Sequence, residues 1–280
     1  MKNFHMYCLS LHCENFNSLK KIQYIPVGLG NNIFTKEWLK DNTKINISHK
    51  NKYYGEYSFH YWFWKNMINE IDENQWIGFC AYRRYWASSD NKRTEELNKI
   101  INVNNFEDLV FKNIPESWNN YETILTEPLP LGKIKLSKVI KNGGISSIIK
   151  NFKNFITSTS TIKYHFDVFH GVGKIEKAIN LLENNEKYEF AEFLGKNTFN
   201  RENMFICRSK KIIKEYYKSV FKWLSRCEDE FGFNLHSWNE VRIYAFLAER
   251  YLSYWFNKNS KVKEWPFFFF DTHKNKLNIL

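Results

Sequence analysis

A short apolar segment, residues 75–81 (QWIGFCA), constrains the fold of this chain more than any other feature. The segment has no charged residue, so a strand formed here is expected to be buried on both faces. Further apolar runs predict strands at residues 4–11, 22–28, 121–126 and 265–270. Helix signals lie between them, at residues 56–68, 174–182, 209–226 and 237–256. This alternation predicts an α/β fold with parallel strand pairs, in which ligands bind beyond the carboxyl ends of the strands.

The other segments complete the predicted organisation. In residues 56–68, aromatic and aliphatic side chains recur on one helical face. Ser237 and Glu240 have the spacing of a capping box at the start of a late helix. Residues 88–118 are polar and predict a surface excursion, and residues 137–163, rich in Ser, Thr, Lys and Asn, predict a mobile loop. The first turns lack a GxGxxG dinucleotide fingerprint.

Composition narrows the cellular setting and the class of partner. The chain has 280 residues, a net charge of +11 and a pI near 9.2, which suits anionic partners such as phosphorylated metabolites or anionic lipid. The lysines are spread out, which disfavours a nucleic-acid-binding arm. The alternative explanation of the positive charge is a genome bias toward Lys and Asn. Five cysteines without a CxxC pair argue against a disulfide framework or structural zinc. The sequence shows no signal-peptide layout and no membrane-spanning apolar run, so we predict a cytoplasmic, soluble or peripheral protein.

The segment YRRYW follows directly on the predicted strand at 75–81 and is the most informative motif. Arg83 and Arg84 are adjacent, so at a strand end they point to different sides. Each guanidinium is a permanent cation whose planar fork of donors suits the oxygens of a diphosphate. Tyr82 and Tyr85 flank the pair and offer rings for stacking. The alternative is a surface pair that bridges nearby carboxylates.

A second candidate binding segment covers residues 46–66 (NISHKNKYYGEYSFHYWFWKN). A turn here leads into a helix, whose amino end attracts anions and presents free N–H groups. Its polar side chains could contact ribose, base or phosphate; they are Asn46, Ser48, Lys50, Asn51 and Glu56. Helix capping and a core-facing stripe are the simpler explanation for much of this segment.

Candidate acid–base groups occur in the second half of the chain. His165, Asp167 and His170 (HFDVFH) fall in a predicted loop and could ligate a metal or supply a base; a structural role for each histidine is the alternative. Further on, Glu249 lies seven residues after Arg242, on the same face of the late helix. The structural alternative for Glu240 is helix capping. The structural alternative for Glu249 is pairing with an arginine.

Taken in order, these segments resemble a bacterial family of glycosyltransferases of capsule and lipopolysaccharide biosynthesis, first catalogued as a domain of unknown function. The resemblance spans roughly residues 4–256, and the 46–66 block and YRRY are its specific parts. Departures occur at Ala81, where the family has His, at Gly55, where it has Cys, and near Asn203, where an insertion displaces the family's Asn. The shared motifs are Ile25-Pro26-Val27-Gly28, the 46–66 block, residues 77–86, Asn203-Met204-Phe205-Ile206, and Arg242 with residues 245–250.

The resemblance implies a GT-A-like fold, with a mixed, mostly parallel sheet flanked by helices. It also implies a single domain over 1–280, with a donor half at about 1–130, an acceptor half at about 131–260 and a terminal strand and tail at 261–280. The donor-binding residues predicted by motif and resemblance together are Gly28, Asn46, Ser48, Lys50, Asn51, Glu56, Tyr82, Arg83, Arg84, Tyr85, Asn203 and Arg242.

The predicted activity is transfer of a sugar from a nucleoside diphosphate donor, a UDP-sugar, to an oligosaccharide or lipid-linked glycan. The chain has no Asp-x-Asp metal motif, so we predict no metal cofactor and expect guanidinium groups to neutralise the diphosphate; manganese or magnesium is the alternative. We expect peripheral contact with the inner face of an anionic membrane. We expect no nucleic-acid partner, since no RNA-binding signature occurs. A non-catalytic nucleotide-sugar or glycan-binding protein is the alternative function.

An inverting transferase also needs a base for the acceptor hydroxyl. We place it in the second half of the chain, because the first half is assigned to the donor. His170 and Glu249 rank first, because they fall in motifs shared with the family. Asp167 and then Glu240 follow.

Overall fold

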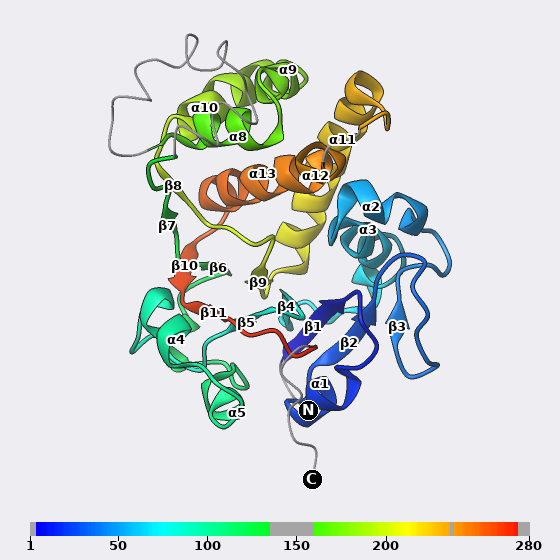
Figure 1. The fold of residues 1–280 in the computed structure, drawn as a ribbon, viewed down its shortest axis with the longest axis vertical. Coiled ribbons are helices and arrows are strands. Elements are labelled where there is room, and N and C mark those ends of the chain that lie inside the picture. The colour runs from blue at the N-terminus through cyan, green and yellow to red at the C-terminus, as the bar shows by residue number, and fades with distance from the viewer. Residues whose placement is uncertain (1–3, 135–159, 236–237, 274–280) are drawn as a thin grey trace.

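The computed structural model describes residues 4–134, 160–235 and 238–273, and Figure 1 shows their arrangement. The strands are β1 (Phe4–Ser10), β2 (Ile25–Gly28), β3 (Leu39–Lys40), β4 (Trp76–Ala81), β5 (Arg84–Trp86), β6 (Thr123–Thr126), β7 (Leu129–Pro130), β8 (Thr198–Phe199), β9 (Phe205–Cys207), β10 (Val262–Trp265) and β11 (Phe267–Phe269). The α-helices are α1 (Phe16–Lys21), α2 (Asn51–Tyr54), α3 (Tyr57–Asn66), α4 (Thr94–Ile100), α5 (Phe106–Leu109), α8 (Ile162–His170), α9 (Lys174–Asn180), α10 (Asn184–Leu194), α11 (Lys210–Phe231), α12 (Trp238–Val241) and α13 (Ile243–Asn259). Short 3₁₀ turns are η1 (Ser48–Lys50), η2 (Ile68–Glu70) and η3 (Glu116–Trp118).

One central sheet organises the described part of the chain. Its strand order is β10-β6-β9-β4-β1-β2-β3, with β5 and β11 attached beside β4. β1 runs parallel to β2 and β4, and β6 runs parallel to β10, while β9 lies antiparallel between β4 and β6. The predicted α/β class with a mixed, mostly parallel sheet is therefore confirmed.

Side chains along the central strands alternate between two hydrophobic cores. In β1, Tyr7 and Leu9 belong to one core, whereas Met6 and Cys8 belong to the other. Strand β4 repeats the pattern, because successive side chains of a strand point to opposite faces. Both faces are thus buried, as expected for parallel strands of this composition.

Helices cover both faces of the sheet. The core that contains Tyr7 is closed by α3, α8, α9, α10, α11 and α13, and the opposite core by α1, α4 and α5 (Figure 1). The latter helices lie partly in the segment 88–118, which was expected to be a surface excursion. That expectation is wrong, because Phe106, Phe111 and Trp118 are fully buried against the sheet despite the polar residues around them.

Three other expectations need correction. The late strand predicted at 265–270 is two strands, because β10 ends before Pro266 and β11 turns to pair antiparallel with β5. The late helix is divided at Arg242 into α12 and α13. His165, Asp167 and His170 lie in helix α8 and not in a loop. Of the predicted loop at 137–163, residues 137–159 lie outside the described residues, as does the capping residue Ser237.

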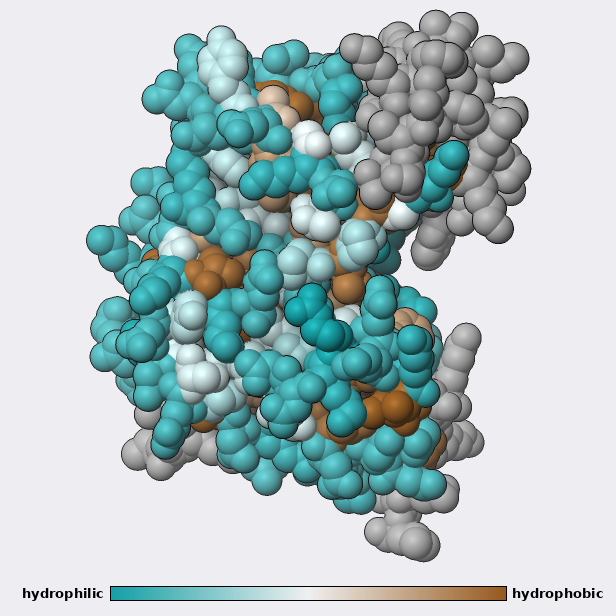
Figure 2. Space-filling model, turned by 90° about the vertical axis from the view of Figure 1, so that its left-hand side faces the viewer, coloured by the Kyte–Doolittle hydropathy of each residue, from teal (hydrophilic) through white to brown (hydrophobic). Residues whose placement is uncertain are grey.

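The surface seen from the side of α4 and β10 is mostly hydrophilic, with hydrophobic residues in small separate patches (Figure 2). Among the helices that the structure describes, none is long and apolar enough to cross a membrane. The longest, α11, buries one face and carries charged residues along the rest of its length.

Candidate active site

A cavity of about 520 Å³ lies beyond the carboxyl ends of β1, β2 and β4. Leu9, Leu29 and Ala81, at or just after the ends of these strands, form part of its wall. This is the edge where ligands bind in open α/β sheets. We name it the arginine cavity; its other lining residues are Leu11, Asn51, Lys52, Gly55, Glu56, Tyr82, Arg83, Arg84, Leu235, Val241 and Arg242.

Arg83 stands out among the cations of this cavity. Within the described part of the chain no carboxylate forms an ion pair with it. Its Nε atom is buried and has no hydrogen-bond partner there, and its guanidinium lies 4.9 Å from the centre of the Tyr82 ring. Because a buried charge-bearing donor is costly to leave unpaired, this arrangement suits an anionic ligand.

The two other cavity arginines are already paired. Arg84 forms a salt bridge with Glu202, and Arg242 donates to Glu56 at 3.1 Å. Burial alone would raise the pKa of Glu56, but Arg242, a backbone hydrogen bond and the nearby Arg84 outweigh it and hold that pKa below its usual value. Glu56 therefore stays ionised. The cavity keeps an excess of positive charge even when Glu202 is counted, because Lys52 and Arg83 remain.

Gly55 allows Arg242 to enter the cavity wall. Its φ of +54° is a conformation that side-chain-bearing residues adopt rarely, and a Cβ placed there would lie 2.5 Å from Nη2 of Arg242. The Asn51 amide donates to the Gly55 carbonyl at 2.9 Å and to the Ser58 hydroxyl at 2.9 Å. Asn51 thus holds this turn, and the residue is a lining group whose amide already has protein partners.

Several predicted donor residues do not line the arginine cavity. Lys50 forms a salt bridge with Glu228 at 2.6 Å. The Asn46 side chain accepts hydrogen bonds from the Ser48 backbone and hydroxyl, which shapes the turn before α2. These three residues support the segment that carries Asn51 and Glu56.

Three more predicted donor residues also lie away from the cavity lining. Tyr85 is fully buried, and its hydroxyl donates to the Tyr82 carbonyl. A Cβ at Gly28 would lie 2.4 Å from the Phe34 ring, so this glycine permits close packing. Asn203 is buried and donates to the Ala245 carbonyl at 3.4 Å. In the structure these residues position their neighbours.

The four predicted base candidates occupy different surroundings. Asp167 accepts hydrogen bonds from the backbone of Gly173 and from Lys163, and so fixes the turn after α8. His170 stacks on the Phe246 ring at 3.8 Å. Glu240 forms a salt bridge with Lys174 at 2.9 Å. None of these three lines the arginine cavity.

Glu249 is linked to a cavity arginine through the residues to which it is bonded. It accepts a hydrogen bond from the backbone N–H of Glu202 at 2.8 Å and forms a salt bridge with the fully buried Arg250. Since Glu202 in turn pairs with Arg84, a continuous polar chain joins α13 to the cavity.

Sequence reasoning missed Glu202 and the turn that holds it. Glu202 has a φ of +82° and Asn203 a φ of +52°, two successive residues in the left-handed region, which is uncommon for residues other than glycine. The sequence offers one signal, an acidic residue directly before the shared motif that begins at Asn203. Nothing in it indicates that Glu202, in this turn, meets Arg84 on strand β5.

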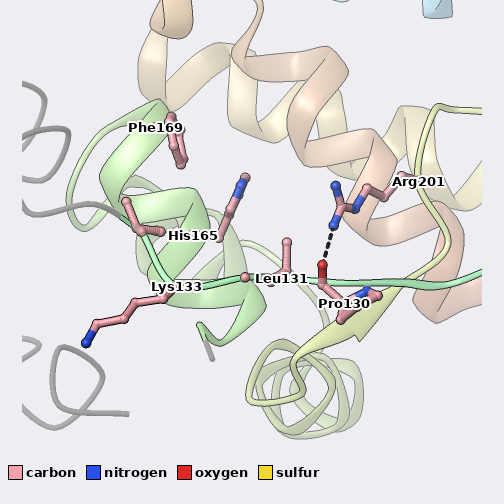
Figure 3. Close-up of a pocket in the computed structure, with 8 residues that line it drawn as sticks. Pro130, Leu131, Lys133, His165, Phe169 and Arg201 are labelled. Carbon is pink, nitrogen blue, oxygen red and sulfur yellow. Dashed lines mark hydrogen bonds between the residues drawn. The ribbon is translucent and has the colours of Figure 1, made fainter. Parts of the chain in front are cut away.

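A second cavity of about 370 Å³ lies next to this turn (Figure 3). His165, Phe169 and Arg201 contribute to its wall, and Arg201 also donates to the carbonyls of Leu129 and Pro130. Its remaining lining residues are Pro130, Leu131, Gly132, Lys133 and Ile134. The wall combines an aromatic ring with polar and cationic groups, a combination that suits an oligosaccharide bearing hydroxyl or anionic groups.

Metal-binding residues can also be tested against the structure. The arginine cavity offers a divalent cation one carboxylate, Glu56, which Arg242 already holds, so its lining does not fit a metal. Among the described residues, His12, Glu14 and His273 bring their ligand atoms within 4.8 Å of one another, close to Tyr82. The two imidazoles are stacked 4.0 Å apart with nearly parallel planes, so at least one ring would have to turn before both could ligate one ion.

Comparisons with known proteins agree with this architecture. A family model described as "Domain of unknown function (DUF4422)" matches residues 8–260. Among solved structures, the apo structure of the bifunctional glycosyltransferase WbbM matches with a TM-score of 0.69 and 22% sequence identity, over 95% of this chain and 45% of that chain. This similarity establishes a shared fold, and the present chain spans less than half of the WbbM chain. A comparison with curated proteins gives no match.

Proposed function

The chain belongs to the family described as domain of unknown function DUF4422, and from its fold and its arginine cavity we propose that it is a GT-A-like glycosyltransferase. The proposed reaction moves a sugar from a nucleoside diphosphate donor, a UDP-sugar, to a glycan acceptor of a capsular or other surface polysaccharide. The likeness to a bifunctional glycosyltransferase supports the reaction class through the shared fold.

The observation that carries this proposal is Arg83. Its guanidinium lines the arginine cavity, has a buried Nε without a hydrogen-bond partner among the described residues, and forms no ion pair with a carboxylate there. A diphosphate supplies the paired oxygens that such a fork of donors binds best. The placement beyond the strand ends supports a nucleotide as the molecule that carries this diphosphate.

In the proposed mechanism the arginines stabilise the negative charge of the leaving group. As the sugar leaves, negative charge grows on the diphosphate, and Arg83 and Arg84 stabilise it from fixed positions. A well-placed donor of this kind contributes about 3–4 kcal/mol to the transition state. The Tyr82 ring, against which Arg83 lies, keeps the guanidinium in place. The lining of this cavity does not fit a divalent cation, so no step is assigned to one.

We place the acceptor on the side of the second cavity. The Phe169 ring offers a surface for stacking on a sugar, and Arg201 and Lys133 offer positive charge to an anionic glycan or a lipid-linked phosphate. The proposed acceptor is an oligosaccharide or lipid-linked glycan. Peripheral attraction to anionic membranes follows from the net charge of +11 and would contribute about 1 kcal/mol for each basic residue near the surface.

The test is a panel of UDP-, GDP- and dTDP-sugars, with release of the nucleoside diphosphate measured in the presence and absence of oligosaccharide acceptors. The proposal expects release from at least one donor, accelerated by an acceptor, and loss of release in an Arg83→Ala/Arg84→Ala double variant. Tight binding of a nucleotide-sugar without any release would instead support a non-catalytic binding protein. Release that the double variant retains in full would contradict the site.

A further inference from the structure

The residues around the arginine cavity single out a carboxylate that sequence motifs do not identify. We propose that Glu202 takes the proton from the acceptor hydroxyl, and that Arg84 holds Glu202 in place until it is shared with the donor diphosphate. This inference rests on the proposed glycosyltransferase function and names the base of that reaction.

Glu202 links the two cavities through its neighbours, although its own side chain is not among the residues that line either of them. Its salt-bridge partner Arg84 lines the arginine cavity, and its chain neighbour Arg201 lines the second cavity (Figure 3). A base for glycosyl transfer must reach the acceptor hydroxyl while it faces the sugar on the donor. Among the carboxylates described above, Glu202 is the one whose direct neighbours line both cavities.

The carboxylate of Glu202 is also available for a proton. Arg84 contacts one of its oxygens through Nε, and within the described residues the other oxygen has no hydrogen-bond partner. The side chain keeps 22% of its surface exposed. By contrast, Asp167 binds Gly173 and Lys163 through its two oxygens, and Glu249 binds the Glu202 backbone and Arg250. These carboxylates are occupied in holding structure.

The backbone of Glu202 is fixed at some energetic cost. Glu202 and Asn203 are two successive residues in the left-handed region, which residues other than glycine adopt only where the surrounding structure holds them. Glu249 holds this turn by accepting from the Glu202 backbone N–H at 2.8 Å, and Arg250 neutralises Glu249. The base candidate Glu249 is therefore a positioning residue in this account, and it aims the Glu202 side chain at Arg84.

The charges that face Glu202 come from four elements. They are Arg84 on β5, Glu249 on α13, Arg201 on the preceding turn and Glu56 before α3. Burial raises the pKa of Glu202, Arg84 and Arg201 oppose this, and the two carboxylates reinforce it. When the diphosphate binds the terminal nitrogens of Arg84, a second anion shares the same guanidinium. Glu202 then becomes a stronger base at the moment when the donor is present.

The proposed step is balanced in atoms and electrons. The acceptor oxygen forms a bond to the anomeric carbon as the bond from that carbon to the phosphate oxygen breaks. The electron pair of the broken bond leaves with the nucleoside diphosphate, which Arg83 and Arg84 stabilise. The hydroxyl proton moves to the open oxygen of Glu202, which later returns it to solvent.

The experiment compares wild-type protein with Glu202→Gln, which keeps the shape and a hydrogen-bond acceptor for Arg84 but is not a base. Transfer is measured with the donor found in the panel, UDP binding by calorimetry, and folding by thermal denaturation. We expect kcat to fall by about 10²- to 10⁴-fold. UDP affinity should stay equal or rise, because a competing anion is gone. The ascending acid limb of the wild-type kcat–pH profile should be absent in Glu202→Gln.

Two further variants separate a catalytic from a structural role. Glu202→Asp keeps the charge and should recover part of the turnover, with a displaced acid limb. Glu183→Gln removes an exposed carboxylate paired with Lys222 and Arg226 and should behave as wild type. Wild-type-like turnover in a folded Glu202→Gln protein would overturn the inference and leave the proposed function standing. A wild-type protein that neither binds UDP nor releases nucleotide from any donor would overturn both.

Discussion

Replacing Arg83 with alanine should weaken nucleotide binding without harming the fold. A hydrogen bond to a charged group contributes about 1.5–3 kcal/mol, and each 1.4 kcal/mol is a tenfold change in affinity, so UDP should bind roughly 10- to 150-fold more weakly. Since Arg83 pairs with no carboxylate in the described part of the chain, its removal leaves no anion unpaired. The melting temperature should therefore stay the same or rise slightly.

The matched control is Arg242→Ala, which removes an equal charge from the same cavity. Here Glu56 loses the cation that keeps it ionised, so the protein should lose about 1–3 kcal/mol of unfolding free energy. Calorimetric titration with UDP and thermal denaturation of both variants make the comparison. UDP affinity within twofold of wild type in Arg83→Ala, or a destabilisation equal to that of Arg242→Ala, would refute the reasoning.

Three other perturbations test separate parts of the account. Gly55→Ala should displace Arg242 and lower both stability, by about 1–2 kcal/mol, and UDP affinity, whereas Gly132→Ala, with open space around it, should fold as stably as wild type; equal melting temperatures for the two would contradict this. Burial lowers the pKa of His60 to about 3, so between pH 6.5 and 3 this imidazole is protonated in the unfolded chain but not in the folded protein. The free energy of unfolding should therefore fall by about 1.4 kcal/mol for each pH unit in that range. His60→Phe should remove this slope in urea titrations at several pH values. EDTA should leave turnover within twofold, and activity that EDTA abolishes and manganese restores would point instead to a metal, with His12→Ala testing the His12 cluster.

Local sequence patterns predict the central sheet because the composition of each strand depends on whether its faces are buried. Tyr7 and Cys8 are both apolar, as they must be in a strand covered on two sides, and the same holds for the strand that ends at Ala81. The approach of YRRYW to Asn51 and Glu56 also followed from the sequence, because parallel strands bring their carboxyl ends to one edge. What was predictable was thus the location of the cavity.

The pairing of the cavity charges was not predictable, because it depends on residues far apart in the chain. Arg84 and Arg83 are indistinguishable as neighbours in sequence, yet only the position of Glu202 decides which of them is paired. The burial of Trp118 was not predictable from the polar composition of residues 88–118, since one large ring can anchor an otherwise hydrophilic segment. The left-handed turn at Glu202 has no glycine to mark it.

A crystal structure of the protein with bound UDP tests the central claim most directly. The account predicts that the diphosphate lies within hydrogen-bond distance of the Arg83 guanidinium in the arginine cavity, with Arg84 shared between a phosphate oxygen and Glu202. The nucleoside should contact the ends of β1 and β4 and the segment from Asn51 to Glu56. A diphosphate bound elsewhere, with no contact to Arg83 or Arg84, would contradict the account.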